Sequence, residues 1–151
     1  MRLSQITGLP ARELDKLFWR RGVVATPREE WVKIQQVLTA EDAWILDGDL
    51  GPYDAVEVRL QVADTIVFLD FSLALCLWRA VRRSPERADF WRWLLRYRQQ
   101  SRPFLMKAIA QHAPHATLHV LSTPKALRFF LADLARRRSE EQQTRAGNCK
   151  L

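Results

Sequence analysis

The stretch TIVFLDFSLALCLWRAVRR, residues 65–83, decides the fold class of this chain. Thr65–Asp70 is continuously apolar up to its final aspartate, which is typical of a strand buried on both faces of a parallel sheet. A helix is predicted from Ser72 onward, apolar at first and with arginines in its last turn, where positive charge interacts favourably with the helix dipole. A strand followed at once by a helix is the repeating unit of α/β proteins, so the stretch predicts an α/β fold.

The same alternation of strands and helices extends in both directions along the chain. Three further short strands are predicted, at Ala11–Asp15, Ala43–Gly48 and Thr117–Ser122. Helix starts are marked by a hydroxyl residue followed by proline, at Thr26-Pro27, Ser84-Pro85 and Thr123-Pro124. Glu29 would complete a capping box with Thr26. Together these elements predict a three-layer α/β architecture built on a parallel sheet.

The remaining segments complete one domain, residues 1–135. Residues 2–7 read as the tail of an amphipathic helix that stops at Gly8, and a long helical stretch runs from Pro85 towards Ala113 with a break near Pro103. Residues 136–151 are polar and lack periodicity, so a frayed, disordered tail is expected there.

Composition limits the classes of protein to which the chain can belong. Its 151 residues are 48% apolar and 27% charged, an ordinary globular balance. No apolar run is long enough to span a membrane, and the two cysteines are too few for a disulfide framework or a zinc site. We therefore expect a cytoplasmic protein without a membrane partner. The net charge of +7, mostly from arginine, suits phosphate groups of either a nucleotide or a nucleic acid.

Three of the four predicted strands end in aspartate, at Asp15, Asp47 and Asp70. Ligands of open α/β sheets gather at the carboxyl ends of the strands, so these side chains predict a polar site at one edge of the sheet. A single aspartate at such a place is explained equally well as a turn residue.

Several motifs occur in the order found in a known family. They are ELDKLFW at residues 13–19, TPREEW at 26–31, AWILDGD at 43–49, VADTIVFLDFSLALCLWRAVRR at 62–83, FWRWLLRYRQQSRP at 90–103 and LHVLSTPKALRFFLADL at 118–134. On these motifs the chain resembles the DNA topology modulation protein family, whose P-loop kinase-like members are related to adenylate kinase and other nucleoside monophosphate kinases. The resemblance implies a nucleotide-dependent phosphotransferase that uses ATP and Mg²⁺ on a small acceptor.

The resemblance also implies roles for residues on the acceptor side. Asp15 would hold a hydroxyl or amine of the acceptor, and Trp19 would stack on a base or close the pocket; as an alternative, Trp19 is a core aromatic. Asp47 would orient magnesium-bound water, and Gly48 would let the backbone approach the substrate, with Asp49 beside it. A simple Asp-Gly turn is the alternative for this last group.

On the nucleotide side, the resemblance implies a short lid around residues 83–98. Arg79 and Arg83 share one helix face and would stabilise charge on the transferring phosphoryl group. Further arginines of the lid, Arg92, Arg96 and Arg98, lie beside an apolar stripe that is more typical of core packing. Thr123 and Pro124 would lie against the adenine, although a capped helix start explains them equally well.

The phosphate-binding loop of that family, Gly-x-x-x-x-Gly-Lys-Ser/Thr, does not occur in these 151 residues. In the family it follows a central strand, which would lie between Ala43–Gly48 and Thr65–Asp70. The resemblance therefore implies an N-terminally truncated chain, in which those two strands either pair directly or leave a gap. We expect no ATP turnover by this chain. Two alternatives are a basic DNA-binding protein and an inert relative of the kinases, in which the arginines serve only packing.

Overall fold

A computed structural model describes residues 2–83, 97 and 99–148 of the chain. Its first half contains α1 (Arg2–Thr7), β1 (Ala11–Glu13), α2 (Leu14–Phe18), β2 (Trp19–Arg20), β3 (Val24–Ala25), α3 (Arg28–Thr39), β4 (Ile45–Asp47) and the 3-10 turn η1 (Gly51–Tyr53). Its second half contains α4 (Val56–Leu60), β5 (Thr65–Leu69), α5 (Leu73–Arg83), α7 (Ser101–His112), β6 (Thr117–Leu121) and α8 (Pro124–Asn148).

Two pairs of parallel strands form the centre of the molecule. β1 pairs with β4, with Ala11 opposite Ile45 and Glu13 opposite Asp47. β5 pairs with β6 over their full lengths, from Thr65 opposite Thr117 onward. A short antiparallel pair, β2 with β3, forms a hairpin at the side. The mixed α/β fold with parallel strands that the sequence predicts is confirmed.

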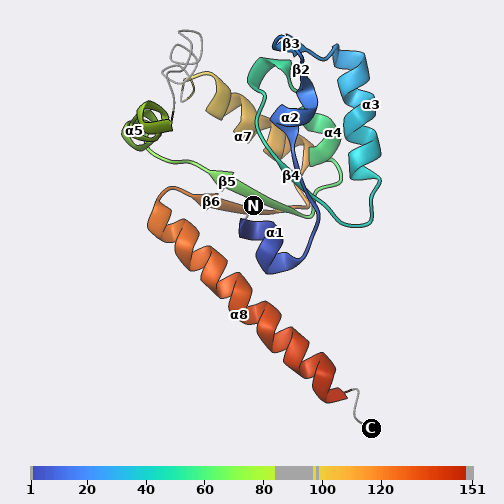
Figure 1. The fold of residues 1–151 in the computed structure, drawn as a ribbon, viewed down its shortest axis with the longest axis vertical. Helices are drawn as coiled ribbons and strands as arrows, with labels where there is room; N and C mark the ends of the chain where they lie inside the picture. The colour runs from blue at the N-terminus through green and yellow to red at the C-terminus, as the bar shows by residue number, and fades with distance from the viewer. Residues whose placement is uncertain (1, 84–96, 98, 149–151) are drawn as a thin grey trace.

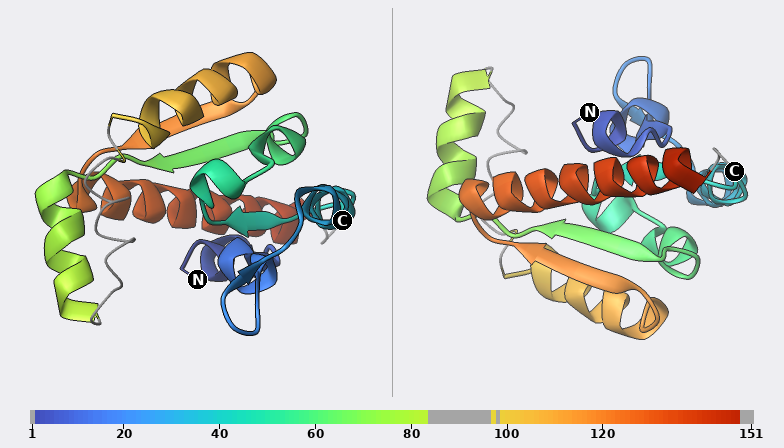
Figure 2. Two further views of the ribbon diagram at one scale, coloured as in Figure 1. Left: turned by 90° about the horizontal axis from the view of Figure 1, so that it is seen from above. Right: turned by 90° about the horizontal axis from the view of Figure 1, so that it is seen from below.

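The two parallel pairs are not joined into one sheet. Among the described residues β4 hydrogen-bonds only to β1 and β5 only to β6, so each strand keeps one open edge. β4 and β5 nevertheless run side by side in the same direction, as Figure 2 shows in its left view. Of the two outcomes expected from the sequence, direct pairing or a gap, the structure has the gap.

Helices cover both sides of the strands. α1 and α8 pack together on one side, while α3, α4 and α7 lie on the other (Figure 1). The buried core is divided in the same way as the strands. One cluster is centred on Leu14, Phe18 and Trp31 near β1 and β4, and a second on Leu60 and Ile109 near β5 and β6.

The predicted strands are shorter in the structure, and Asp15 does not end a strand. β1 stops at Glu13, and Leu14 and Asp15 begin α2. Leu14 and Phe18 are four residues apart, so the helical turn buries both of them completely. β4 likewise omits Ala43, Trp44 and Gly48, while β5 and β6 lose only their last predicted residue.

The predicted caps differ in outcome. Thr26 does not cap α3: its buried hydroxyl donates a 2.6 Å hydrogen bond to the carbonyl of Phe18, and the cap position belongs to Pro27. Thr123 does cap α8, because the amide of Ala126 donates to its hydroxyl at 3.1 Å. Residues 99 and 100 form a turn and α7 begins only at Ser101, so the predicted break near Pro103 is present, with Pro103 in the first turn of the helix, where a proline is tolerated. The predicted cap at Ser84 lies outside the described residues.

Residues 136–148, which the sequence predicts to be a disordered tail, are helical instead. α8 continues through Arg136 to Asn148. The guanidinium of Arg136 bridges Asp133 at 2.5 Å and Glu140 at 3.2 Å, spacings that link successive turns of a helix. In the part of the chain that the structure describes, no helix combines the length and apolar character that crossing a membrane requires.

Candidate functional site

The acceptor-side residues predicted from the sequence meet where β1 and β4 end. Asp47 is the last residue of β4, and Asp15 lies in the first turn of α2 just after β1. Gly48 brings the two segments together. Its φ of +141° is a conformation that favours glycine, and a Cβ added there would lie 3.1 Å from the Cβ of Leu14 and 3.6 Å from Oδ2 of Asp15. The approach of the two segments thus requires glycine at this position.

The Asp15 carboxyl is less acidic than a free aspartate. Burial raises its pKa, and the nearby negative charges of Asp47, Asp54 and Glu13 raise it further. A hydrogen bond with the Trp19 side chain acts in the opposite direction. A carboxylate held near other carboxylates attracts a proton or a cation more strongly, which suits it to accept a hydrogen bond from a ligand hydroxyl.

Trp19 lies between the core and the surface. Its ring meets the buried ring of Phe18 edge-on at a centroid distance of 4.8 Å, and that of Tyr53 at 5.9 Å. Because the side chain is only half-buried, part of the indole remains accessible beside Asp15. The core interpretation therefore describes its packing, and the stacking role of the accessible part stays a prediction.

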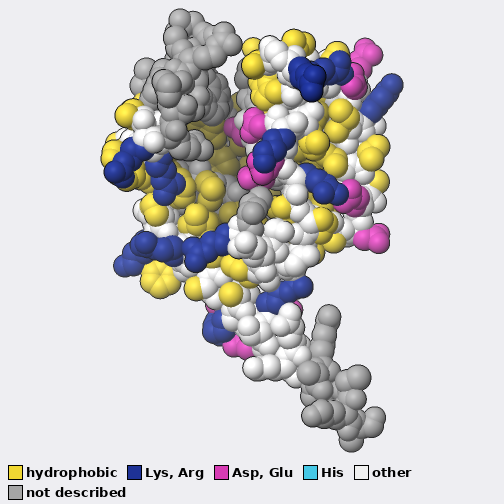
Figure 3. All heavy atoms as spheres, in the orientation of Figure 1, with side chains coloured by type: hydrophobic (Ala, Val, Ile, Leu, Met, Phe, Trp, Pro, Cys, Tyr) yellow, Lys and Arg dark blue, Asp and Glu magenta, His cyan; other side chains and the backbone are white. Residues whose placement is uncertain are grey.

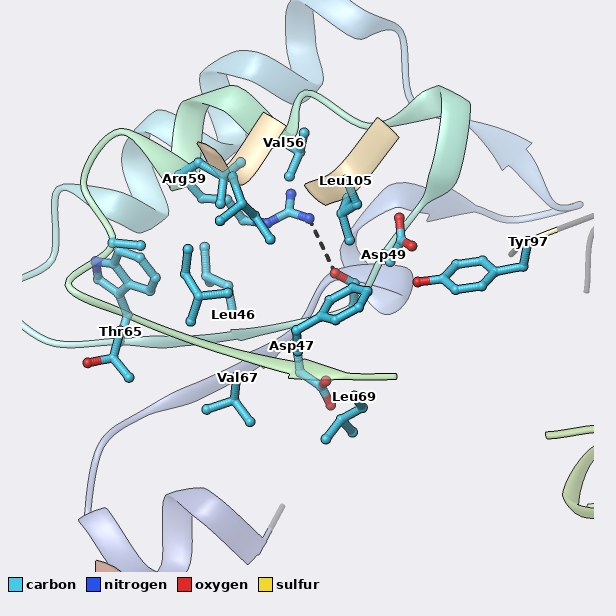
Figure 4. A pocket seen from close by; sticks show the side chains of 17 residues that line it. Leu46, Asp47, Asp49, Val56, Arg59, Thr65, Val67, Leu69, Tyr97 and Leu105 are labelled. Carbon is cyan, nitrogen blue, oxygen red and sulfur yellow. Dashed lines mark hydrogen bonds between the residues drawn. The ribbon is translucent and has the colours of Figure 1, made fainter. Parts of the chain in front are cut away.

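A cavity of about 320 Å³ occupies the gap between β4 and β5 (Figure 4). Leu46 and Asp47 line one side, and Val67 and Leu69 line the other. In the view of Figure 4 both strands cross the cavity in the same direction, and the side chains of Asp47, Asp49 and Tyr97 lie towards their carboxyl ends. Of the acceptor-side residues, Asp47, Gly48 and Asp49 line the cavity, whereas Asp15 and Trp19 lie outside its lining.

Arg59 enters this cavity from α4 and was not predicted from the sequence. Its guanidinium holds the buried carboxylate of Asp54 at 2.6 and 2.9 Å and donates to the carbonyl of Gly48 at 3.3 Å. Burial alone would raise the pKa of Asp54, but the hydrogen bonds and charge of Arg59 outweigh it and lower that pKa. Arg59 therefore positions the Gly48 turn and is already neutralised by its partner.

Tyr97 and Asp49 lie at the carboxyl-terminal mouth of the cavity. The Tyr97 hydroxyl points towards Asp49 in Figure 4. Burial and the charges of Asp49 and Asp70 raise the pKa of Tyr97 to about 12. Burial also raises the pKa of Asp49, against a 2.9 Å hydrogen bond from the amide of Gly51. Both groups therefore attract protons more strongly than free side chains do.

Asp70, the third predicted strand-end aspartate, has a different role. It follows β5 and accepts hydrogen bonds from Nε and Nη2 of Arg102 at 2.8–3.1 Å. Its side chain is 13% exposed, so the pair joins β5 firmly to the start of α7. The three aspartates share one end of the molecule, but only Asp15 and Asp47 lie together.

The nucleotide-side residues lie apart from the cavity. Arg79 is exposed on α5, with its guanidinium carbon 5.2 Å from the centroid of the Phe71 ring. Thr123 and Pro124 form the capped start of α8. Arg83 ends α5, and its side chain lies outside the described residues, as do Arg92, Arg96 and Arg98.

The side chains at this site suit Mg²⁺ better than they suit ATP. Asp47 offers an exposed carboxylate at a strand end, a ligand type that Mg²⁺ accepts. Within the described ranges, however, no group of three metal-ligating side chains is assembled. The sequence contains no glycine-rich loop to hold a triphosphate, so the residues present do not fit ATP.

The chain shows no match to any known family model, curated protein or solved structure in the three comparisons made. Its site is therefore defined by its own geometry.

Arg59 and Tyr97 were not predicted from the sequence, because their hydrogen-bond partners come from other elements. The one signal for Arg59 was a cation inside the otherwise amphipathic segment VEVRL.

Proposed function

We propose that this chain binds the phosphoryl acceptor of a nucleotide-dependent phosphotransferase of the nucleoside monophosphate kinase type. The observation that carries the proposal is the meeting of Asp15, Trp19, Asp47 and Gly48 at the carboxyl ends of β1 and β4, beside the open cavity. A carboxylate next to an accessible aromatic plane binds a hydroxylated, base-containing ligand by hydrogen bonding and stacking.

The arrangement of the strands supports the same proposal. One parallel strand placed between β4 and β5 would complete a continuous sheet in the order β1-β4-new strand-β5-β6, covered by helices on both faces. The completed sheet would match the three-layer fold that the resemblance implies for the kinase family. The phosphate-binding loop would have to come from a segment outside these 151 residues.

In this proposal each residue has a defined task. The carboxylate of Asp15 accepts the hydrogen bond of the acceptor hydroxyl, and Trp19 covers the acceptor base. Asp47, with Asp49 nearby, would hold water of a magnesium ion, which supplies positive charge for phosphate groups when it is bound. The phosphoryl-stabilising role expected of Arg79 and Arg83 stays a prediction, because Arg79 lies on α5 away from the cavity.

Calorimetric titration of the purified chain with nucleosides and nucleoside monophosphates tests acceptor binding. We expect binding that Asp15→Asn weakens by about tenfold, because a charge-assisted hydrogen bond is lost. Asp42→Asn is the matched control: it makes the same change at an exposed carboxylate away from the site and leaves binding unchanged. Equal affinities of the two variants, or no binding to any acceptor of this class, would overturn the proposal.

Measurement of ATP turnover tests whether this chain binds the acceptor while ATP binding needs an added phosphate-binding loop. We expect none from the 151-residue chain, and we expect ATP binding once a strand and a Gly-x-x-x-x-Gly-Lys-Ser/Thr loop precede Met1, whether encoded upstream or added by design. ATP hydrolysis by the unextended chain would contradict this part of the proposal.

A further inference from the structure

Three cation–aromatic pairs lie on the surface formed by α5 and the first turns of α8. The guanidinium carbon of Arg79 lies 5.2 Å from the ring centroid of Phe71, and that of Arg82 lies 4.6 Å from that of Trp78. On α8, the ammonium nitrogen of Lys125 lies 5.7 Å from the ring centroid of Phe129. We call these six residues the basic-aromatic surface. None of them lines the cavity between β4 and β5.

The three cations and two of the three rings are open to solvent, and the third ring, Phe71, is half-buried. Trp78 is 56% exposed and Phe129 is 65% exposed, which is unusual for large aromatic side chains. In Figure 3, Lys and Arg side chains gather over α5 and over the start of α8, with hydrophobic side chains beside them. In all three views of Figures 1 and 2, α5 and the first turns of α8 lie at the same end of the molecule.

The cations of this surface are not neutralised by carboxylates in the described part of the chain. α5 contains no acidic residue, and no ion pair among the described residues includes Arg79, Arg82 or Lys125. By contrast, two arginines in the C-terminal half of α8, Arg136 and Arg137, both form ion pairs with Asp133. The surface therefore offers positive charge to a ligand from outside.

We propose that the basic-aromatic surface binds single-stranded nucleic acid. A guanidinium placed over an aromatic ring keeps its N–H donors directed outward in its own plane, where they reach phosphate oxygens. The exposed rings and the guanidinium planes provide stacking faces for unpaired bases. The surface thus offers cations for the phosphates and aromatic rings for the bases of a single strand.

The same geometry favours a single strand over duplex DNA and over a membrane. Bases in a duplex are stacked on one another, so their faces cannot reach Trp78 or Phe129. Insertion into a lipid bilayer requires an apolar face with its cations at the margins. Here the cations lie over the rings, so insertion of the rings would bury charge.

Fluorescence anisotropy with a labelled oligothymidine of about 15 nucleotides tests the proposal. Trp78→Ala and Phe129→Ala are each expected to weaken binding by about tenfold without changing its salt dependence, because they remove stacking but no charge. Lys125→Gln is expected to reduce the slope of log K against log salt by about 0.7, the value for one lost phosphate contact to a single strand.

Matched controls come from other faces of the molecule. Lys33→Gln makes the same charge change at an exposed position of α3. Phe104→Ala removes a ring that is 58% exposed on α7. Both variants should bind the oligonucleotide as the unaltered chain does. Equal loss in the controls and the surface variants would overturn the proposal, as would tighter binding to a duplex of equal length. Binding to phosphatidylserine vesicles without binding to the oligonucleotide would also overturn it. None of these outcomes depends on the proposed phosphotransfer function.

Discussion

Asp54 and Arg59 show at the scale of single residues how the site is held in place. The Asp54 carboxylate, 1% exposed, accepts hydrogen bonds from Trp31 and Gln35 of α3 as well as from Arg59. Arg59 in turn reaches the carbonyl of Gly48. The pair therefore connects α3 and α4 to the turn at the candidate acceptor site, and its loss should affect both stability and ligand binding.

Arg59→Met is expected to lower the free energy of unfolding by about 3–5 kcal/mol, because it leaves the buried Asp54 carboxylate without its charge partner. Urea unfolding measures the change. The exposed pair offers the control: Arg136→Met should cost only about 0–1 kcal/mol. Equal costs for the two variants would contradict the central role of Arg59.

The pH dependence of stability follows from the same pair. Because Arg59 lowers the folded-state pKa of Asp54, the stabilisation is fully present above the unfolded pKa of about 3.9 and is lost as pH falls through the folded value. Unfolding measured across acid pH should show this loss in the unaltered chain, and a smaller one in Asp54→Asn. An unchanged acid profile in that variant would contradict the assignment.

The ionisation of the Tyr97 hydroxyl gives a further prediction for a single residue. The chain has two tyrosines, so in Tyr53→Phe the absorbance of tyrosinate reports Tyr97 alone. We expect ionisation near the value of about 12 that burial and Asp49 impose. Because the folded pKa is raised, Tyr97 stabilises the fold below its unfolded pKa of about 10, and this is lost as pH rises through 12. Ionisation at the unperturbed value would contradict the half-buried position of Tyr97 beside Asp49.

At the scale of elements, two threonines with the same local sequence pattern form different hydrogen bonds. Thr123 and Thr26 both precede proline, and both predict a helix cap. Thr123 does cap α8, but the Thr26 hydroxyl binds the carbonyl of Phe18, because the β2–β3 hairpin brings that carbonyl within reach. A local pattern cannot specify which of two available partners a hydroxyl takes.

Thr123→Ala is expected to cost about 1 kcal/mol of stability, since the first turn of α8 loses an accepted amide hydrogen bond. Thr144→Ala in the same helix is the control. Its hydroxyl bonds back to the carbonyl of Glu140, an interaction that adds little to a helix, so stability should stay within about 0.5 kcal/mol. Thermal unfolding compares the two; equal losses would argue against the cap.

At the scale of the whole molecule, the gap between β4 and β5 divides the structure into two halves. Each half has its own strand pair and its own buried cluster, with Leu14 and Trp31 in one and Leu60 and Ile109 in the other. Cooperative units within proteins often coincide with such supersecondary groups. The two halves should therefore open separately.

Leu14→Ala is expected to lower stability by about 3 kcal/mol and to speed amide exchange in β1 and β4 more than in β5 and β6. Ile109→Ala should produce the opposite distribution. Hydrogen exchange read by mass spectrometry separates these segments. Equal acceleration of all four strands by either substitution would show that the halves unfold as one unit.

The sequence by itself determined the elements that depend on local patterns: the parallel-type strands at 65–69 and 117–121 and the helices that begin near Leu73 and Pro124. It also placed Asp47 and Asp70 at the ends of their strands, but not Asp15, which lies in α2. Periodicity and capping chemistry act between residues close in the chain, so they can be recognised there. Only the tertiary structure decided that Asp15 faces Gly48 while Asp70 binds Arg102, that Arg59 crosses to Asp54, and that cations of α5 and α8 share one surface. These contacts join segments far apart in the sequence, where charge and burial depend on which elements pack together.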